Sequence, residues 1–401
     1  MKHKVPINIV AIIPSFYKNN GEGVNERQFI NALSKHVKKI YVFTFEDIRK
    51  LMKVKKQKLN LPKNIIQISI PLIKAPLIST MLMIFTSYLL SFILLIFDYI
   101  IGVELIYIRY SLPSIGIITL KPLASKVVVK IPSIIEDEIR YRGLTNKFIK
   151  KFIVIIEKIV LLKAKVIAVP SKELYREILK RRNVQRIDNF IEAMPGLDLD
   201  FIEKIKRTPY EKRNLKRKIF TVGFIGSLVW WQGIDTLIKA IALLRRQSIP
   251  IHLLIIGDGP QRPIIENMLK VLKVSYEITG SIPHKEALKL LKRIDMLVLP
   301  RPHTSFTEFL IPMKVLEAWA LGVPIIVTRH KIFTSLGIKD YEDLIYCEPN
   351  PKNVAERLLC LLRNDNLRLK LAMKGPKIAK RFTYNRVIDE LLNMTTKTTS
   401  H

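Results

Sequence analysis

A lysine and a glutamate stand three residues apart in a segment that otherwise has the composition of a buried helix, residues 307–324 (TEFLIPMKVLEAWALGVP). Pro312 is expected at the first helical position, where its missing N–H is no loss. Lys314 then falls in the first turn, at the helix end that already carries positive partial charge. A cation is stabilised there only if an anion shares the site. Glu317 lies one turn further along the same face, where a carboxylate can accept two hydroxyl hydrogen bonds.

This spacing has two interpretations. The first is a site for a ligand that carries a diphosphate and a diol, with the phosphates at Lys314 and the helix N-terminus and a ribose at Glu317. The second is an ordinary ion pair between neighbours on one helix. The helix alone favours neither.

Two glycine-containing loops upstream could approach a ligand closely. Residues 223–235 (GFIGSLVWWQGID) read as a strand, a glycine turn and the start of a helix, and residues 255–263 (IIGDGPQRP) repeat this order. Glycine lets the backbone come near a ligand, and the helix N-terminus that follows attracts phosphate. Each loop taken alone is also an ordinary turn between a strand and a helix.

The elements that must position these loops alternate along the chain. Short apolar runs are separated by helical patterns, which predicts an α/β fold with parallel sheets covered on both faces. A charged stretch, residues 204–218 (KIKRTPYEKRNLKRK), interrupts the series and is the expected linker. We therefore expect two Rossmann-like domains, residues 1–207 and 208–382, with residues 383–401 packing back on the first. Ligands of such sheets bind beyond the carboxyl ends of the strands.

Composition limits the possible partners. Lysine and arginine outnumber the acids 67 to 34, for a formal charge of +33. This favours phosphorylated small molecules or an anionic membrane surface, or it reflects a solvated basic surface. The basic runs lack interleaved aromatic residues, so nucleic acid is not an expected partner. Cys347 and Cys360 have no metal-ligand spacing and the histidines are scattered, so we expect no metal site, no cofactor and a cytoplasmic protein.

Residues 75–97 contain no charged side chain, and a basic run, residues 49–58 (RKLMKVKKQK), precedes them. The length would allow a membrane span. Strand patterns on both sides instead favour a core helix with one face at the membrane interface, beside basic residues that suit anionic head groups.

Four blocks in the second half resemble the family-4 retaining glycosyltransferases in order and spacing: GFIGSLVWWQGIDTLIKA, LLIIGDGPQRPIIENML, ITGSIPHKEALKLLKRIDMLVLP and PMKVLEAWALGVPIIVT. These enzymes have the GT-B architecture of two Rossmann-like domains facing across a cleft. The resemblance runs through most of residues 223–350 and is weaker in the N-terminal half. There PSFYKNNGEG would be the family's glycine loop and would contribute Gly21 and Gly23 to the acceptor side. FTYNRVIDELL is similar to the final helix that crosses back to the first domain.

The resemblance implies transfer of a sugar from a nucleotide-sugar donor with retention of anomeric configuration and without a metal. Glu317 matches the glutamate that holds the ribose. The donor-binding positions that it implies are Gly226, Ser227, Gln232, Gly257, Leu310, Ile311 and Met313.

The sequence departs from the family at three places. Phe309 stands where the first of two paired glutamates is usual, and Glu308 is one position out of register, so Glu308 is the candidate that reaches the sugar. Ser227 and Gln232 replace an arginine and a lysine that hold phosphate, and Lys314 is the cation expected to compensate. A P-x-K-x-x-E pattern resembles a variant of this superfamily.

The acceptor side is less defined. No histidine follows KVVVKIP, where many members have one, and Lys130 or Glu138 could take its place. The basic surface and residues 75–97 favour a glycan or lipid-linked acceptor at the inner face of the cell membrane, with a soluble acceptor as the alternative. Other functions left open are a basic membrane- or nucleotide-binding protein with an impaired site, and a sugar-nucleotide epimerase.

Overall fold

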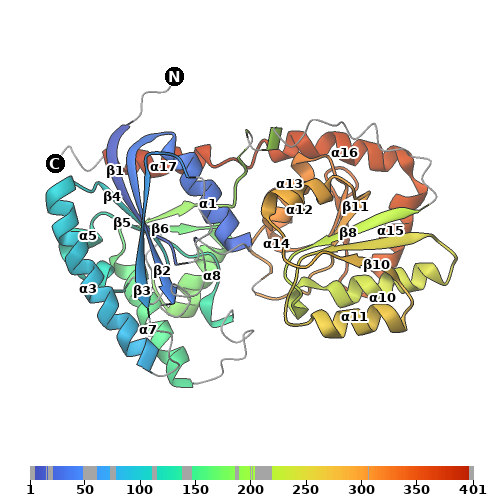
Figure 1. The fold of residues 1–401 in the computed structure, drawn as a ribbon, viewed down its shortest axis with the longest axis horizontal. Coiled ribbons are helices and arrows are strands. Elements are labelled where there is room, and N and C mark those ends of the chain that lie inside the picture. The colour runs from blue at the N-terminus through green and yellow to red at the C-terminus, as the bar shows by residue number, and fades with distance from the viewer. Residues whose placement is uncertain are drawn as a thin grey trace. The chain divides into compact units, whose positions relative to one another are not determined.

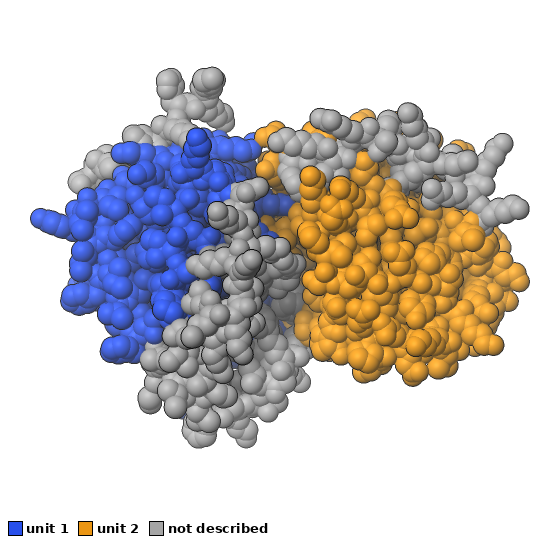
Figure 2. All heavy atoms as spheres, viewed as in Figure 1, with its two compact units in different colours: residues 1–18, 25–194, 384–401 blue, residues 19–24, 195–383 orange. Residues whose placement is uncertain are grey.

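The structure is a computed structural model, and it describes residues 5–14, 16, 21–47, 61–72, 78–110, 115–137, 147–185, 189–198, 200, 202–203, 219–305 and 307–396. The chain divides into two compact units (Figure 2). Unit 1 comprises Met1–Lys18, Asn25–Met194 and Tyr384–His401, and unit 2 comprises Asn19–Val24 and Pro195–Thr383. The expected linker, residues 204–218, lies outside the described residues.

Unit 1 contains a parallel sheet of seven strands in the order β3-β2-β1-β4-β5-β6-β7. Its strands are β1 (Val5–Ile12), β2 (Val37–Asp47), β3 (Ile65–Leu72), β4 (Leu105–Arg109), β5 (Val127–Lys130), β6 (Val166–Val169) and β7 (Phe190–Glu192). Its helices are α1 (Gly21–Ser34), α3 (Ile78–Ile101), α4 (Ile115–Thr119), α5 (Lys121–Ala124), α7 (Lys147–Lys163), α8 (Lys172–Arg182) and α17 (Asn385–Thr396).

Successive side chains along the strands of unit 1 point to opposite faces of the sheet, and a core forms on each face. On β2, Ile40 and Val42 belong to a core that α1 and α17 share. Tyr41 and Phe43 point to the other face, where both rings contact Phe97 of α3. The last helix of the chain therefore packs on unit 1, while α3 covers the opposite face of the same sheet (Figure 1).

Unit 2 contains a second parallel sheet, with six strands in the order β10-β9-β8-β11-β12-β13. Its strands are β8 (Phe220–Ile225), β9 (Ile251–Ile256), β10 (Ser275–Ile278), β11 (Met296–Leu299), β12 (Ile325–Thr328) and β13 (Ile345–Cys347). Its helices are η3 (Trp230–Gln232), α10 (Ile234–Arg245), α11 (Arg262–Val271), α12 (His284–Leu291), α13 (Met313–Ala320), α14 (Lys331–Ser335), α15 (Pro351–Arg363) and α16 (Asp365–Ala379).

The α/β fold with two parallel sheets is confirmed. The apolar runs predicted it correctly because strands buried on both faces are apolar throughout: β11 and β12 are buried at every position. Helices α10 and α11 cover one face of the second sheet, and α13 and α16 lie on the other face (Figure 1).

Two local details differ from expectation. Pro312 is the residue that precedes the helix, with extended backbone angles, and α13 begins at Met313. The helix α1 begins at Gly21, so Gly21 and Gly23 lie in a helical turn and not in a glycine loop.

Among the described residues, no helix combines the length and apolar character that crossing a bilayer requires.

Candidate donor site in unit 2

Two glycine turns meet at the carboxyl ends of β8 and β9. Gly226 has φ 145° and Gly257 has φ 142°, conformations that side-chain-bearing residues rarely adopt. The N–H of Gly226 donates to the carbonyl of Ile256 at 2.9 Å. A Cβ on Gly257 would lie 2.0 Å from the carbonyl oxygen of Gly226. The two turns predicted from the sequence therefore touch, and both need glycine.

The side chain of Lys314 reaches across from the start of α13 to the first of these turns. Its Nζ donates to Gln232 Oε1 at 3.1 Å and lies 5.7 Å from the centre of the Phe224 ring. It is so close to Gly226 that a Cβ there would be 2.2 Å away. The structure thus brings together Gly226, Gln232 and Lys314, three residues that the sequence separates by up to 88 positions (314 − 226 = 88).

A second cation, Arg301, lies beside this group and was not predicted from the sequence. It directly follows β11 and the proline at position 300, and its side chain is only 5% exposed. Gly233, with φ 74°, packs against this point, since a Cβ there would be 2.0 Å from the carbonyl oxygen of Pro300. The Arg301 Nε is buried and has no hydrogen-bond partner. Within the described part of the chain, no carboxylate pairs with Arg301 or Lys314.

These surroundings lower the pKa of both side chains. Burial, together with repulsion from Arg301, lowers the pKa of Lys314 to about 7, although Glu317 attracts the charge. Burial alone lowers the pKa of Arg301 to about 10. Two neighbouring cations without a carboxylate are costly in the free protein, so the arrangement favours an anion that neutralises both.

Glu317 does not pair with Lys314 along the helix. Its carboxylate is 4% exposed, and Oε1 lies 2.6 Å from His284 Nε2, at the start of α12. No hydrogen bond to Glu317 Oε2 occurs among the described residues, so this oxygen can accept one from a ligand. The second interpretation of the Lys314–Glu317 spacing, an intrahelical ion pair, is therefore not what the structure shows.

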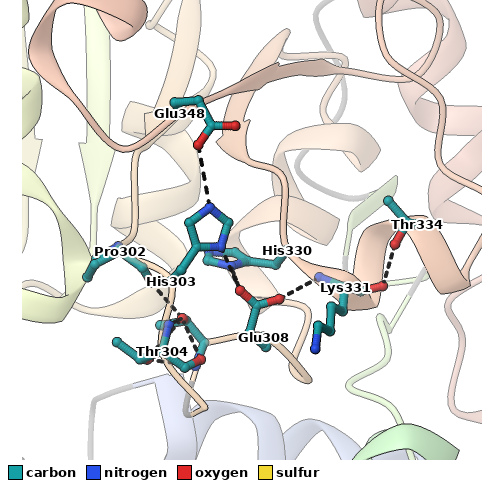
Figure 3. Close-up of polar contacts among 9 residues, drawn as sticks. Pro302, His303, Thr304, Glu308, His330, Lys331, Thr334 and Glu348 are labelled. Carbon is teal, nitrogen blue, oxygen red and sulfur yellow. Dashed lines mark hydrogen bonds and ion pairs between the residues drawn. The ribbon is translucent and has the colours of Figure 1, made fainter.

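The loop before α13 is held by Glu308 (Figure 3). One carboxylate oxygen lies 2.6 Å from His303 Nδ1 and 3.4 Å from His330 Nδ1, and the other accepts from the N–H of Lys331 at 2.8 Å. His303 Nε2 in turn lies 3.7 Å from Glu348. Glu308 is thus already engaged by three protein groups. Its carboxylate joins the loop after β11 to the start of α14.

Burial opposes ionisation of Glu308, but hydrogen bonds from His330, the Lys331 N–H and His303 outweigh it and lower its pKa to about 2. His303, Glu308 and His330 also bring one potential ligand atom each to within 4.8 Å of one another, which could hold a metal ion. The sequence did not predict this group. Its members come from two loops, and their spacing matches no ligand motif.

The remaining donor-side positions surround the same point. Ser227 is exposed in the first turn, directly before the buried Leu228. Leu310 and Met313 are partly buried, whereas Ile311 is fully buried and anchors the segment in the core. The backbone of residues 310–314 therefore runs from the Glu308 loop into the first turn of α13.

In unit 1, Lys130 has a protein partner. It ends β5, is 6% exposed, and places Nζ 2.8 Å from Oε1 of the fully buried Glu26. Arg109 Nη1 lies 2.6 Å from the same oxygen, and the Tyr107 hydroxyl donates to Glu26 Oε2 at 3.1 Å. Lys130 is thus part of a buried ion cluster that joins α1 to β4 and β5. Glu138, the other acceptor-side candidate, lies outside the described residues.

We expect Gly226→Ala to disturb the candidate site. The added methyl group meets Lys314 Nζ, and the positive φ strains any side chain, at a cost of about 1–3 kcal/mol. Thermal unfolding should show a lower Tm and the loss of any stabilisation by donor. Gly21→Ala is the matched control, because nothing lies within 4 Å of its Cβ. Equal Tm values for the two variants would show that the turn does not need glycine.

Comparison with known proteins finds similarity in the segment that contains these residues. Residues 219–364, which contain every donor-side residue above, match the family described as "Glycosyl transferases group 1". An uncharacterized glycosyltransferase of Methanocaldococcus jannaschii is 28% identical over 166 residues, 41% of this chain and 44% of that protein. The 2-deoxystreptamine N-acetyl-D-glucosaminyltransferase of Niallia circulans is 27% identical over 209 residues, 50% and 49% of the two chains.

The matches span about half the length of these curated relatives. Similarity of fold extends further. The crystal structure of Anabaena HepE in complex with UDP and glucose superposes on 98% of this chain and 100% of that chain, with a TM-score of 0.68 and 14% sequence identity. Residues 219–364 of the second unit are therefore similar to the group 1 glycosyltransferases, and the likeness to the solved structure supports two Rossmann-like units, as in the GT-B architecture.

Proposed function

We propose that the protein transfers a sugar from a nucleoside-diphosphate sugar to a glycan or a lipid-linked acceptor, with retention of anomeric configuration. We place the reaction at the inner face of the cell membrane, with the donor bound in unit 2. The acceptor class rests on the basic, partly apolar character of the chain. Retention rests on the resemblance of residues 223–350 to family-4 enzymes.

One observation carries the proposal: Arg301 and Lys314 lie together without a carboxylate partner at the carboxyl ends of the second sheet. A diphosphate carries two negative charges at neutral pH and would neutralise both cations. Ligands of open parallel sheets bind at this edge. The N–H groups at the start of α13 add positive partial charge at the same place.

Glu317 supplies the second point of attachment. A ribose presents two neighbouring hydroxyl groups, and the free Oε2 of Glu317 can accept a hydrogen bond from one of them. His284 holds the other carboxylate oxygen and so fixes the orientation of the acceptor atom. The spacing of Lys314 and Glu317 on α13 then matches the order of phosphate and ribose in a nucleotide.

The same groups explain how transfer could be accelerated. As the bond between the sugar and the diphosphate breaks, negative charge grows on the leaving phosphate. Arg301, Lys314 and the N–H groups of residues 310–314 would stabilise this charge without reorganisation, which is the largest catalytic contribution in many enzymes. Two protein cations at the diphosphate supply the charge that a divalent ion would otherwise provide, so we propose that transfer needs no metal.

The donor site is tested by thermal stabilisation with UDP-, GDP- and ADP-sugars, each with and without EDTA. UDP-sugars come first, since UDP is the nucleotide of the Anabaena neighbour. We expect one nucleotide class to raise the Tm of the wild type, in either condition, and to leave that of Glu317→Ala unchanged. Glu286→Ala, an exposed glutamate of α12, is the control and should respond as the wild type.

Two outcomes would contradict the proposal. If no nucleotide-sugar stabilises the wild-type protein, the two cations hold another anion. If Glu317→Ala is stabilised as strongly as the wild type, the ribose assignment is wrong. Loss of stabilisation in EDTA would show that a metal takes part, and His303, Glu308 and His330 would then be the first residues to substitute.

A further inference from the structure

The outer face of α3 is apolar although it faces solvent. Its exposed large side chains recur at helical spacing along one side: Phe85, Tyr88, Leu89, Phe92, Ile93, Ile96, Tyr99 and Ile100. Tyr99 is 93% exposed, and Phe92 is 66% exposed. Single exposed apolar residues are common on proteins, but a continuous row along four helical turns marks an interaction surface.

The inner face of α3 carries two small polar side chains among its apolar ones. Ser87 and Ser91 are fully buried, together with Leu90 and Leu94. Ser87 Oγ accepts from the N–H of Gly116 in α4 at 2.6 Å, and Ser91 Oγ donates to the Ser87 carbonyl at 2.7 Å. A helix on the surface of a protein in water normally has an apolar stripe inside and a polar outer face, whereas α3 is apolar on its outer face as well.

Close packing fixes this orientation. A Cβ on Gly116 would lie 2.7 Å from the carbonyl oxygen of Ser87, so α4 approaches α3 to backbone contact at the serine side. Phe97 of α3 also packs against Tyr41 and Phe43 of β2. The helix cannot turn its large apolar side chains inward without losing both contacts, and their exposure is therefore built into unit 1.

Basic side chains lie on α7, a helix that shares the neighbour α4 with α3. The helix α4 packs against both α3 and α7, and the exposed face of α7 alternates lysines with apolar residues in the order Lys151, Ile155, Lys158, Leu162. The one acidic residue of α3, Asp98, is paired with Lys126 at 2.7 Å. The described residues thus combine an apolar row on α3 with lysines on α7, and both helices pack against α4.

We propose that the outer face of α3 lies in the interface of an anionic bilayer, with Lys151 and Lys158 of α7 at the lipid head groups. A helix of 24 residues is roughly 36 Å long, and it would lie along the membrane plane with its serine face on the protein. Tyrosines suit the boundary between lipid and water, and lysines near the surface attract anionic lipids.

A lipid surface fits these residues better than a protein partner does. Protein interfaces combine apolar anchors with matched polar and hydrogen-bonding groups, whereas the row from Phe85 to Ile100 offers only the hydroxyl groups of Tyr88 and Tyr99. Interfacial helices have an uninterrupted apolar face and lysines beside it. The inference deepens the proposed location at a membrane but does not depend on sugar transfer, because it concerns a different surface.

Vesicle flotation tests it directly. The wild-type protein should float with vesicles of phosphatidylcholine containing about one third phosphatidylglycerol, and less with phosphatidylcholine alone. Phe92→Glu/Ile96→Glu should lower the fraction bound by about tenfold or more, because two charges enter the apolar contact. Lys151→Gln/Lys158→Gln should remove the preference for anionic vesicles and keep the apolar contribution.

The matched control is Ile264→Glu/Val271→Glu, which places the same charges at exposed apolar positions of α11 in unit 2. It should float as the wild type does. Each variant is also tested for nucleotide-sugar stabilisation, which should persist if the fold and the donor site are intact. Failure of the donor site would remove that signal and leave flotation unchanged, so the two proposals fail separately.

Three results would overturn the inference. The first is a wild-type protein that does not float with either vesicle. The second is equal flotation of Phe92→Glu/Ile96→Glu and the wild type. The third is a dimer in solution that the α3 variant dissociates and that excludes vesicle binding, which would make a second copy the occupant of this surface.

Discussion

Arg301→Met should weaken donor binding strongly and at the same time make the free protein more stable. Binding of the stabilising nucleotide-sugar is expected to weaken by about 2–5 kcal/mol, roughly 30-fold or more in Kd, because the diphosphate loses a desolvated cation. The Tm of the protein without ligand should rise by a few degrees. The two changes have opposite signs, and a residue with a purely structural role would not produce them together.

The opposite signs follow from the surroundings of Arg301. Its side chain is 5% exposed, its Nε has no hydrogen-bond partner, and Lys314 repels it. In the free protein a buried cation without a carboxylate costs free energy, and replacing it with an apolar side chain of similar length removes that cost. When the diphosphate binds, the same cation becomes paired, so its contribution appears only in the complex.

Arg246→Met is the matched control, since Arg246 is an exposed arginine at the end of α10 in the same unit. Isothermal titration gives the Kd, and thermal unfolding without ligand gives the stability. The control should leave both values unchanged. A lower Tm for Arg301→Met with an unchanged Kd would show that Arg301 supports the loop after β11 and does not contact the donor.

Sequence patterns predicted the elements that carry the site better than they predicted the site's contacts. The central strands, such as β11 and β12, are short apolar runs between turns, and burial on both faces leaves little freedom in how such runs fold. Lys314 and Glu317 could be singled out because a cation in the first turn of a helix is anomalous on local grounds. That argument needs one helix and no tertiary structure.

Arg301 was missed because its role depends on burial. In the sequence it begins a polar loop, RPHTSF, and resembles an ordinary surface arginine. The signal that could have identified it is its position directly after a strand that is apolar throughout and ends in proline. Side chains at the carboxyl end of such a strand point toward the ligand edge of the sheet.

Glu308 and Lys130 were predicted from the sequence to contact a substrate, but the structure gives both of them protein partners. Each was proposed for a substrate because the family resemblance places a functional residue at or near its position, and each has protein partners that are distant in the sequence. Glu308 is held by His330, 22 positions later, and Lys130 by Glu26, 104 positions earlier. Ion pairs of this kind depend on which loops the fold brings together, and no local pattern reports them.

Donor binding should also be coupled to the uptake of a proton by Lys314. Burial and Arg301 lower the pKa of this lysine to about 7 in the free protein, so above pH 7 most molecules carry it uncharged. A bound diphosphate favours the charged form and raises the pKa. The complex therefore holds more protons than the free protein, and affinity should fall as pH rises above about 7, by up to roughly tenfold per pH unit.

Calorimetric titration with the stabilising nucleotide-sugar, in two buffers of different ionisation enthalpy, measures this uptake. We expect about half a proton per site at pH 7 and close to one above pH 8. The diphosphate of a nucleotide-sugar does not itself titrate in this range, so the proton must come to the protein. His284 contacts Glu317 nearby, and Lys314→Met is needed to assign the proton to the lysine. That variant should bind the donor more weakly and take up no proton. Equal proton uptake by both proteins would assign the proton to another group. Lys314 would then already be charged before the donor binds.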